Sequence, residues 1–194
     1  FGPTSLSATP WNNITSHQES STSSWIKDAE NNYTNIGVRV LGGFTATHAG
    51  VGSEPASPVT VDGVEFPLTA WKDGLLVRGE KNQGDVGPGR IEISQLDAAR
   101  KYNFTILAIR FNGSKDARIS SYKLIGKTES AVKEVKTGIK DVAAFNTASF
   151  EEYIAKFENI EPDSEGKVIV EVKGLDTGSA AEGHINAPVS YTHL

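Results

Sequence analysis

Three tryptophans stand next to polar side chains in segments that the sequence predicts to be loops or strand ends. Each is followed within three residues by amide or charged groups: Asn12 and Asn13 after Trp11, Lys27 and Asp28 after Trp25, Lys72 and Asp73 after Trp71. An aromatic ring offers a rigid apolar face to the C–H face of a sugar, and nearby polar groups can hold its hydroxyls. The alternative, rings that pack over the edge of a folded domain, stays open for each of them.

The loops with Trp25 and Trp71 are the predicted binding region, with Tyr33 as a further ring. Loops that join the strands of a rigid scaffold commonly carry binding residues. The expected partners for sugar hydroxyls are Asp28, Asp73 and Arg78.

Side chains that could catalyse hydrolysis do not occur in a recognisable arrangement. The chain has no Gly-x-Ser-x-Gly motif, and without cysteine it can use no thiolate and form no disulfide. The histidines considered, each isolated in sequence, are His17, His48 and His184. The carboxylate pairs, all in polar or turn-like contexts, are Glu151 with Glu152, Asp28 with Glu30, and Asp163 with Glu165. We therefore expect no enzymatic activity from this chain.

The composition argues against a nucleic-acid partner and against a membrane-spanning segment. The 194 residues carry a formal net charge of −5 and no basic run, which argues against nucleic acid. Hydrophobic residues make up 38% of the chain in runs of only a few residues, so we expect no membrane span.

Alternating apolar residues predict the fold class. Residues 89–126 contain three alternating runs joined by polar turns, and residues 167–173 form another. Asp62 and Gly63 lie between two short β-branched runs and predict a hairpin. We expect an all-β fold, a two-sheet antiparallel β-sandwich or jelly roll. The residues predicted for its shared core are Phe104, Ile106, Val168 and Val170.

One segment, residues 149–157, has two readings. Ser149 and Glu152 form a capping box, which is typical of a helix start. Tyr153, Ala155 and Phe157 alternate, which is typical of a strand. The sequence leaves both open.

The order of several short motifs resembles a known class of module. They are Phe1-Gly2, Trp11-Asn-Asn13, Ser94-Gln-Leu-Asp97, Tyr102-Asn-Phe104, Tyr122-Lys-Leu-Ile-Gly126, Ile160-Glu-Pro-Asp163 with Gly166, and His184-Ile-Asn-Ala187. Together they resemble the galactose-binding-like jelly-roll modules of secreted bacterial polysaccharide-degrading proteins. Such modules often stand beside SGNH-type esterases (serine–glycine–asparagine–histidine hydrolases) or adhesion modules. The resemblance implies that Trp11 closes the bottom of the sandwich and that Ile185-Asn-Ala187 begins the last strand.

The resemblance also implies a function. We expect a non-catalytic, carbohydrate-binding-module-like domain of an extracellular or cell-surface bacterial protein, covalently attached to an enzyme or surface domain, with a polysaccharide or glycan as ligand. One alternative is a structural or adhesive spacer without a small ligand. Another is the accessory domain of an SGNH-type esterase whose catalytic part is missing here, since Gly84-Asp85 is not followed by the serine of the esterase motif. No cofactor is expected, although modules of this type sometimes hold a structural calcium ion.

Both ends of the chain suggest truncation. The last residues, from Val189 to Leu194, match one reading frame of a transposon adapter used in sequencing libraries. We expect residues 1–187 to form a single β-sandwich domain and residues 188–194 to be an adapter-derived tail that packs poorly.

Overall fold

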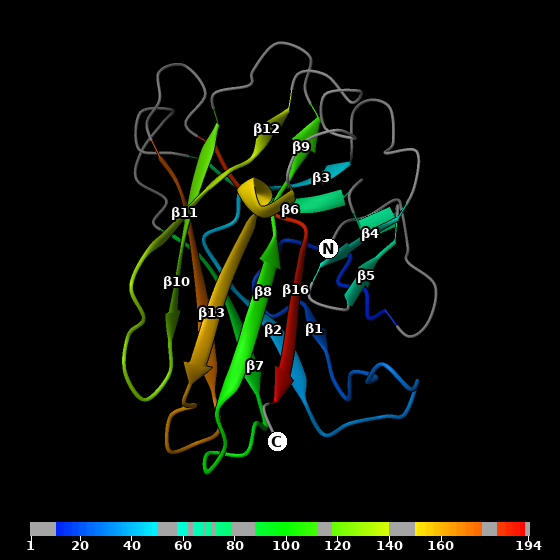
Figure 1. Ribbon diagram of the computed structural model, residues 1–194, viewed down its shortest axis with the longest axis vertical. Coiled ribbons are helices and arrows are strands. Elements are labelled where there is room, and N and C mark those ends of the chain that lie inside the picture. Colours follow the sequence, from blue (N-terminus) through cyan, green and yellow to red (C-terminus); the bar gives the residue numbers. More distant parts are fainter. Residues whose placement is uncertain are drawn as a thin grey trace.

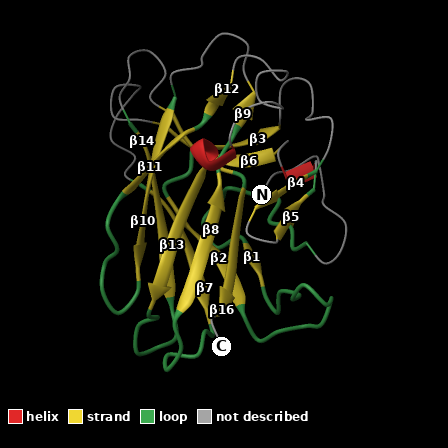
Figure 2. Ribbon diagram, viewed as in Figure 1, coloured by secondary structure: helices red, strands yellow, loops and turns green. Residues whose placement is uncertain are grey.

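Strands dominate the part of the chain that the structure describes (Figures 1 and 2). The computed structural model describes residues 11–49, 58–61, 64–67, 69–70, 73–78, 88–111, 118–139, 150–175 and 182–192. The earlier strands are β1 (Thr22–Ser23), β2 (Gly37–Gly42), β3 (Ala46–Ala49), β4 (Val59–Val61), β5 (Val64–Phe66), β6 (Asp73–Arg78), β7 (Gly89–Ser94) and β8 (Tyr102–Leu107). The later strands are β9 (Arg110–Phe111), β10 (Ile119–Ile125), β11 (Lys133–Lys136), β12 (Gly138–Ile139), β13 (Ile154–Ile160), β14 (Val168–Gly174), β15 (Glu182–Ile185) and β16 (Ala187–Thr192).

Two layers of strands pack face to face around one core (Figure 1). In the described residues, one layer is a six-stranded sheet in the order β1-β2-β7-β14-β10-β11, and the facing layer contains the sheet β13-β8-β16. A further sheet, β15-β6-β3, packs into the same core, and β4 pairs with β5 in the hairpin expected around residues 62–63. The pairs are antiparallel except for β12 with β9, which is parallel. The predicted fold class, an antiparallel β-sandwich, is confirmed.

A continuous apolar row crosses the six-stranded sheet. Leu124 on β10 pairs with Val170 on β14, Val170 with Ile91 on β7, and Ile91 with Val40 on β2. All four side chains are fully buried. Alternation along each strand places these side chains on the same inner face, so the register of four strands builds one wall of the core.

The four residues predicted for the shared core are all buried. Phe104 and Ile106 lie on β8 and are 1% and 0% exposed, and Val168 and Val170 on β14 are both 0% exposed. These strands belong to the two facing sheets, and their side chains meet in one apolar cluster. The prediction of a core shared between the layers is therefore confirmed.

Residues 149–157 contain both of the predicted structures, a short helical turn and the start of a strand. A single 3-10 turn, η1 (Phe150–Tyr153), is followed directly by β13. Ala155 and Phe157 are buried and pair in register with Ile106 and Phe104 of β8. Cross-strand pairing over an apolar face therefore extends the alternating pattern into a strand and limits the helical segment to one turn.

The tail expected to pack poorly forms a strand. The strand β16 pairs with β8 over its whole length, from Ala187 opposite Leu107 to Thr192 opposite Tyr102. The pairing differs from the expectation for residues 188–194, and β8 is the central strand of its sheet because β16 is present. The domain limits, and the adapter origin of these residues, stay predictions.

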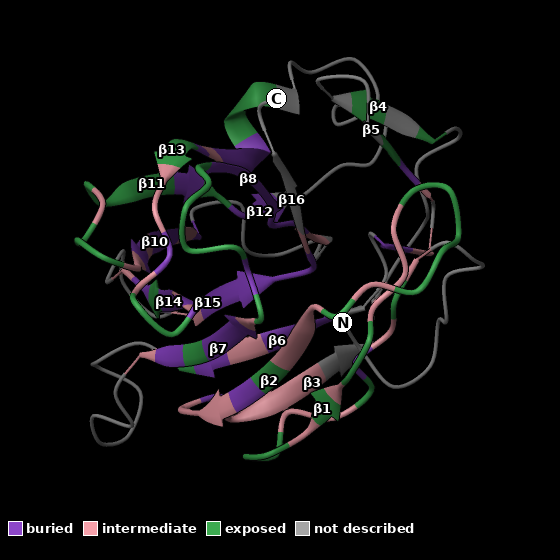
Figure 3. Ribbon diagram, turned by 90° about the horizontal axis from the view of Figure 1, so that it is seen from below, coloured by how far each residue is buried: buried purple, intermediate pink, exposed green. Residues whose placement is uncertain are grey.

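Buried residues are concentrated in the strands of both layers, whereas exposed residues lie mainly on the loops (Figure 3). No helix in the described ranges combines the length and apolar character needed to cross a membrane.

Because the phenol of Tyr122 is buried, we expect the protein to lose stability at alkaline pH. Tyr122 is fully buried on β10 and donates a hydrogen bond to the carbonyl oxygen of His184. Burial raises its pKa above the ordinary value, because the interior disfavours the phenolate. The folded state therefore keeps this contribution below the unfolded-state pKa, about 10, and loses it as pH rises above that value.

We expect urea midpoints of the wild type to fall steeply as pH rises beyond this value, and those of Tyr122→Phe to fall less. Tyr33→Phe is the matched control, since Tyr33 is 73% exposed. Parallel curves for the wild type and Tyr122→Phe would contradict the prediction.

Candidate functional site

Residues 24–36 between β1 and β2, termed here the 24–36 loop, carry the two most exposed aromatic side chains of the described residues. Trp25 is 67% exposed and Tyr33 is 73% exposed. The loop folds back on itself, since Ile26 N donates to the Ile36 carbonyl, Thr34 N donates to the Ile26 carbonyl, and Lys27 pairs with Tyr33 in an isolated bridge. Both rings therefore belong to one small hairpin-like unit at the edge of the six-stranded sheet.

Side chains hold the 24–36 loop in shape. The Asn12 amide accepts from Lys27 N at 2.8 Å and donates to the Lys27 carbonyl at 2.9 Å. The Asp28 carboxylate accepts from Asn32 N at 2.8 Å, which closes the turn over residues 28–32. The Lys27 ammonium lies 5.0 Å from the centre of the Tyr33 ring, within cation–π range. A loop with this many bonds can present its rings with little further loss of entropy.

The backbone of Trp25 adopts a conformation that a bulky residue rarely takes. Its φ is +57°, and Asn31 in the same loop has a φ of +68°. The left-handed region is common for Asn but costs free energy for a side chain such as Trp. Such outliers concentrate at functional positions, where the surrounding structure holds them.

The 24–36 loop thus exposes two aromatic side chains beside polar groups. The Asp28 carboxylate accepts hydrogen bonds from the backbone and side chain of Asn32. A carboxylate has about four acceptor sites, so some remain for a ligand. Three of the predicted site residues, Trp25, Tyr33 and Asp28, are therefore brought together.

The other predicted site residues do not all join this group. Trp71 lies outside the described residues. Asp73 begins β6, although its side chain is not described, and Arg78 is exposed at the other end of that strand. A strand of this length separates its ends by about 17 Å, so Asp73 and Arg78 cannot touch the same small sugar. Arg78 instead pairs in register with Glu182 of β15.

The structure assigns Trp11 to packing. Its ring centre lies 5.6 Å from that of Phe66 in a tilted arrangement, and Phe66 on β5 is fully buried. Trp11 is only partly exposed, and it covers the hairpin of β4 and β5. Trp11 is therefore a packing residue, which is the alternative to sugar binding that the sequence left open.

The sequence analysis missed a second group, termed here the arginine cluster: Arg110, Arg118, Glu182 and His184. One carboxylate oxygen of Glu182 lies 2.7 Å from Nη1 of Arg110 and 2.7 Å from Nη2 of Arg118. His184 Nε2 lies 4.0 Å from the same oxygen. Three N–H groups, at Nε of Arg110 and at Nε and Nη1 of Arg118, are buried and have no hydrogen-bond partner.

Local structure brings the arginine cluster together from three elements: β9, the residue before β10, and β15. Asn186 interrupts one of the alternating runs predicted within residues 89–126, because its side chain accepts from Ile109 N at 2.7 Å and its backbone N donates to the Leu107 carbonyl. β8 therefore ends, and β9 begins at Arg110. Arg118 accepts at its carbonyl from Thr137 N, just before β12, and Glu182 opens β15.

Burial is the dominant influence on both guanidinium groups of the cluster. It lowers the pKa of Arg118, and the positive charge of Arg110 lowers it further. The pKa of Arg110 is also lowered by burial, against an opposing effect of Glu182. The side chain of Arg118 is only 1% exposed, whereas those of Arg110 and Glu182 are 17% and 19% exposed. Arg118 therefore forms the base of the cluster, and Arg110 and Glu182 form its outer side.

Nothing in the sequence spacing marks this cluster, because Glu182 stands 72 positions after Arg110. Only the pairing of β15 with β6 and the break after β8 create the contact.

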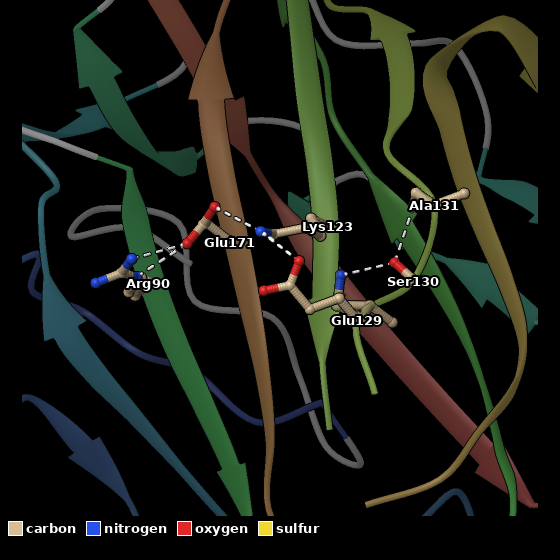
Figure 4. Close-up of polar contacts among 7 residues, drawn as sticks. Arg90, Lys123, Glu129, Ser130, Ala131 and Glu171 are labelled. Carbon is tan, nitrogen blue, oxygen red and sulfur yellow. Dashed lines mark hydrogen bonds and ion pairs between the residues drawn. The ribbon is translucent and has the colours of Figure 1, made fainter. Parts of the chain in front are cut away.

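The outer face of the six-stranded sheet carries ion pairs (Figure 4). Glu171 on β14 accepts from Arg90 on β7 at 2.9 Å and lies 3.7 Å from Lys123 on β10, which also contacts Glu129. Farther along, Arg39 on β2 pairs with Glu92 on β7 at 3.1 Å. In this charged ladder, Glu92 and Glu171 are buried beneath partly exposed arginines, and no aromatic side chain belongs to it.

The carboxylates considered for catalysis serve local structure. Asp163 accepts from Glu165 N and Lys167 N in a turn, and Glu151 pairs with Lys156 at 3.1 Å. His17 contacts Gln18 at 2.8 Å, and the side chain of His48 is not described. In the described ranges, no three His, Asp or Glu side chains gather as metal ligands would. The expectations on catalysis and calcium stay predictions.

The chain matches no protein-family model and no curated protein. One solved structure that is similar to the chain is TmCBM61 in complex with beta-1,4-galactotriose, at 14% sequence identity and a TM-score of 0.36. The alignment covers 63% of this chain and 72% of that chain.

Proposed function

We propose that this protein is a non-catalytic glycan-binding module that holds polysaccharide on the 24–36 loop. The observation that carries the proposal is the pair of exposed rings, Trp25 and Tyr33, on one loop that is fixed by hydrogen bonds within it and to Asn12. Large exposed rings cost free energy in water, and a preformed loop that keeps them there is suited to a ligand that stacks on them.

The setting of the module is part of the same proposal. It belongs to an extracellular or cell-surface bacterial protein and keeps an attached enzyme or surface domain close to polysaccharide. The ladder of ion pairs on the outer sheet face supports a loop site, because a flat sheet platform for a glycan chain would need rings there.

Affinity electrophoresis on polysaccharide gels tests this function. We expect retention with a Kd of roughly 10⁻⁵ to 10⁻³ M, since a shallow site buries little area. Replacing Trp25 or Tyr33 by Ala should weaken binding at least about tenfold for each, as expected when a buried contact ring is truncated. The double variant should migrate as on a gel without polysaccharide.

Val132→Ala is the matched control, because Val132 is also exposed, at 58%, yet lies outside the 24–36 loop. Circular dichroism of each variant checks that the sandwich is intact. Retention of the double variant equal to that of the wild type would remove this loop from the site. No retention of the wild type on any polysaccharide would favour the spacer alternative.

A further inference from the structure

Among the described residues, the arginine cluster has more positive than negative charge in a buried place. Two guanidinium groups share a single carboxylate oxygen of Glu182, so one positive charge has no carboxylate partner in that part of the chain. Exposed charges are stabilised by water, but Arg118 is almost fully buried and two of its nitrogens lack partners. Uncompensated buried charge is costly, and buried charges in proteins are ordinarily paired with an opposite charge.

The donors in this cluster differ from those of an ordinary structural pair. An exposed pair such as Arg100 with Asp97, both more than half exposed, has water for every unfilled N–H group. In the arginine cluster, Nε of Arg110 and Nε and Nη1 of Arg118 are closed to solvent and have no acceptor among the residues that the structure describes. Guanidinium N–H groups match the oxygens of carboxylates and other oxyanions.

We propose that the arginine cluster is a second ligand site, which binds the carboxylate of an acidic sugar. The carboxylate neutralises the remaining positive charge and accepts from the unfilled N–H groups of Arg110 and Arg118. The ligand enters from the outer side, where Arg110 and Glu182 retain 17% and 19% exposure, and Arg110 moves to admit it. The choice of a sugar as the carrier of the carboxylate rests on the proposed function; the anion site itself does not.

The position of Arg78 supports a sugar-sized site. Arg78 is exposed, and its backbone pairs with Glu182, whose side chain is the shared anion of the cluster. A sugar ring that projects outward from the carboxylate would pass near this part of the β6 and β15 edge. The cluster thus gives Arg78, which sequence analysis had placed with the tryptophans, a different neighbourhood.

Thermal denaturation with trigalacturonate as the probe tests the site. A ligand that binds only the folded state raises the melting temperature with its concentration. We expect trigalacturonate to raise the melting temperature of the wild type. Neutral galactotriose at the same concentration has no carboxylate, so we expect no binding of it at this cluster. Sodium acetate at equal carboxylate concentration should protect less, because it lacks the sugar ring. Added NaCl should weaken the effect of trigalacturonate.

Variants assign the effect to the cluster. Arg118→Met and Arg110→Gln should each abolish protection by trigalacturonate while leaving retention on neutral polysaccharide, which depends on the 24–36 loop, unchanged. Arg118→Met removes a buried charge and leaves Glu182 paired with Arg110, and Arg110→Gln serves if the first variant does not fold. Arg100→Gln is the matched control and should respond as the wild type does.

The Glu182→Gln variant tests whether the affinity for trigalacturonate rises when a negative charge is removed from the cluster. Loss of the resident carboxylate leaves two positive charges, so affinity for trigalacturonate should increase several-fold instead of falling. No protection of the wild type by trigalacturonate, or equal protection of the Arg118→Met variant, would overturn the proposal. Protection by acetate equal to that by trigalacturonate would overturn the assignment to a sugar.

Discussion

Replacing Phe104 by Ala is expected to lower the free energy of unfolding by about 3–5 kcal/mol. Phe104 is 1% exposed on the central strand β8 and faces the apolar row of the six-stranded sheet. Its ring lies 6.5 Å from that of Tyr102, centre to centre, and its backbone pairs with Phe157 on one side. Truncation leaves a cavity between two sheets that are held by their own hydrogen-bonded ladders and cannot close on it.

Urea denaturation followed by far-ultraviolet circular dichroism measures this loss. The urea midpoint should fall while the slope with denaturant stays the same, because the fold and the exposed area of the unfolded chain are retained. Val132→Ala provides the control, since that side chain is 58% exposed and should change stability by less than about 0.5 kcal/mol. A change at Phe104 as small as that of the control would contradict the two-layer core.

The core was predictable from sequence because its signal is local. Ile91 and Ile93, or Val168 and Val170, alternate within a few residues of each other, and the period alone assigns their inner face. Which strands pair is a different question, and alternation does not answer it. The row from Leu124 to Val40 joins strands that are far apart in the chain, and only the folded structure gives their order.

The candidate site was predictable in part for the same reason. Trp25, Asp28 and Tyr33 lie within one short segment, so a polar, serine-rich context sufficed to predict a loop that exposes them. Grouping them with Arg78 required knowledge of tertiary contacts that a sequence pattern does not contain. Arg78 is instead opposite Glu182, which stands more than a hundred positions later.

The arginine cluster could not be predicted at all by these means. Isolated arginines and glutamates are usually solvated, and nothing in the sequence around Arg110, Arg118 and Glu182 indicates otherwise. Arg110 follows the end of β8, where the side chain of Asn186 accepts a hydrogen bond from Ile109 N. This contact joins residues 77 positions apart, and no local pattern predicts it.

Residues 188–192 form part of the fold, although their sequence suggests an adapter origin. The sequence of the tail suggested an adapter and hence little packing, yet Val189 and Tyr191 alternate with polar residues as strand residues do. In the structure these residues pair with β8 along its whole length. β8 carries Phe104 and Ile106, so the tail borders the most buried strand of its sheet.

Removal of residues 188–194 is therefore expected to destabilise the protein strongly. β8 would become an edge strand, and its backbone groups now paired with Ala187–Thr192 would lose most of their partners. The loss of several such bonds is large against a domain stability of roughly 5–15 kcal/mol. We expect a fall in melting temperature of more than about 10 °C, or aggregation through the exposed edge.

A chain shortened only by His193 and Leu194 is the control, because it keeps all the residues of β16 that pair with β8. Equal melting temperatures for the two shortened chains would show that β16 adds nothing to the fold and would support the earlier expectation of a tail that packs poorly.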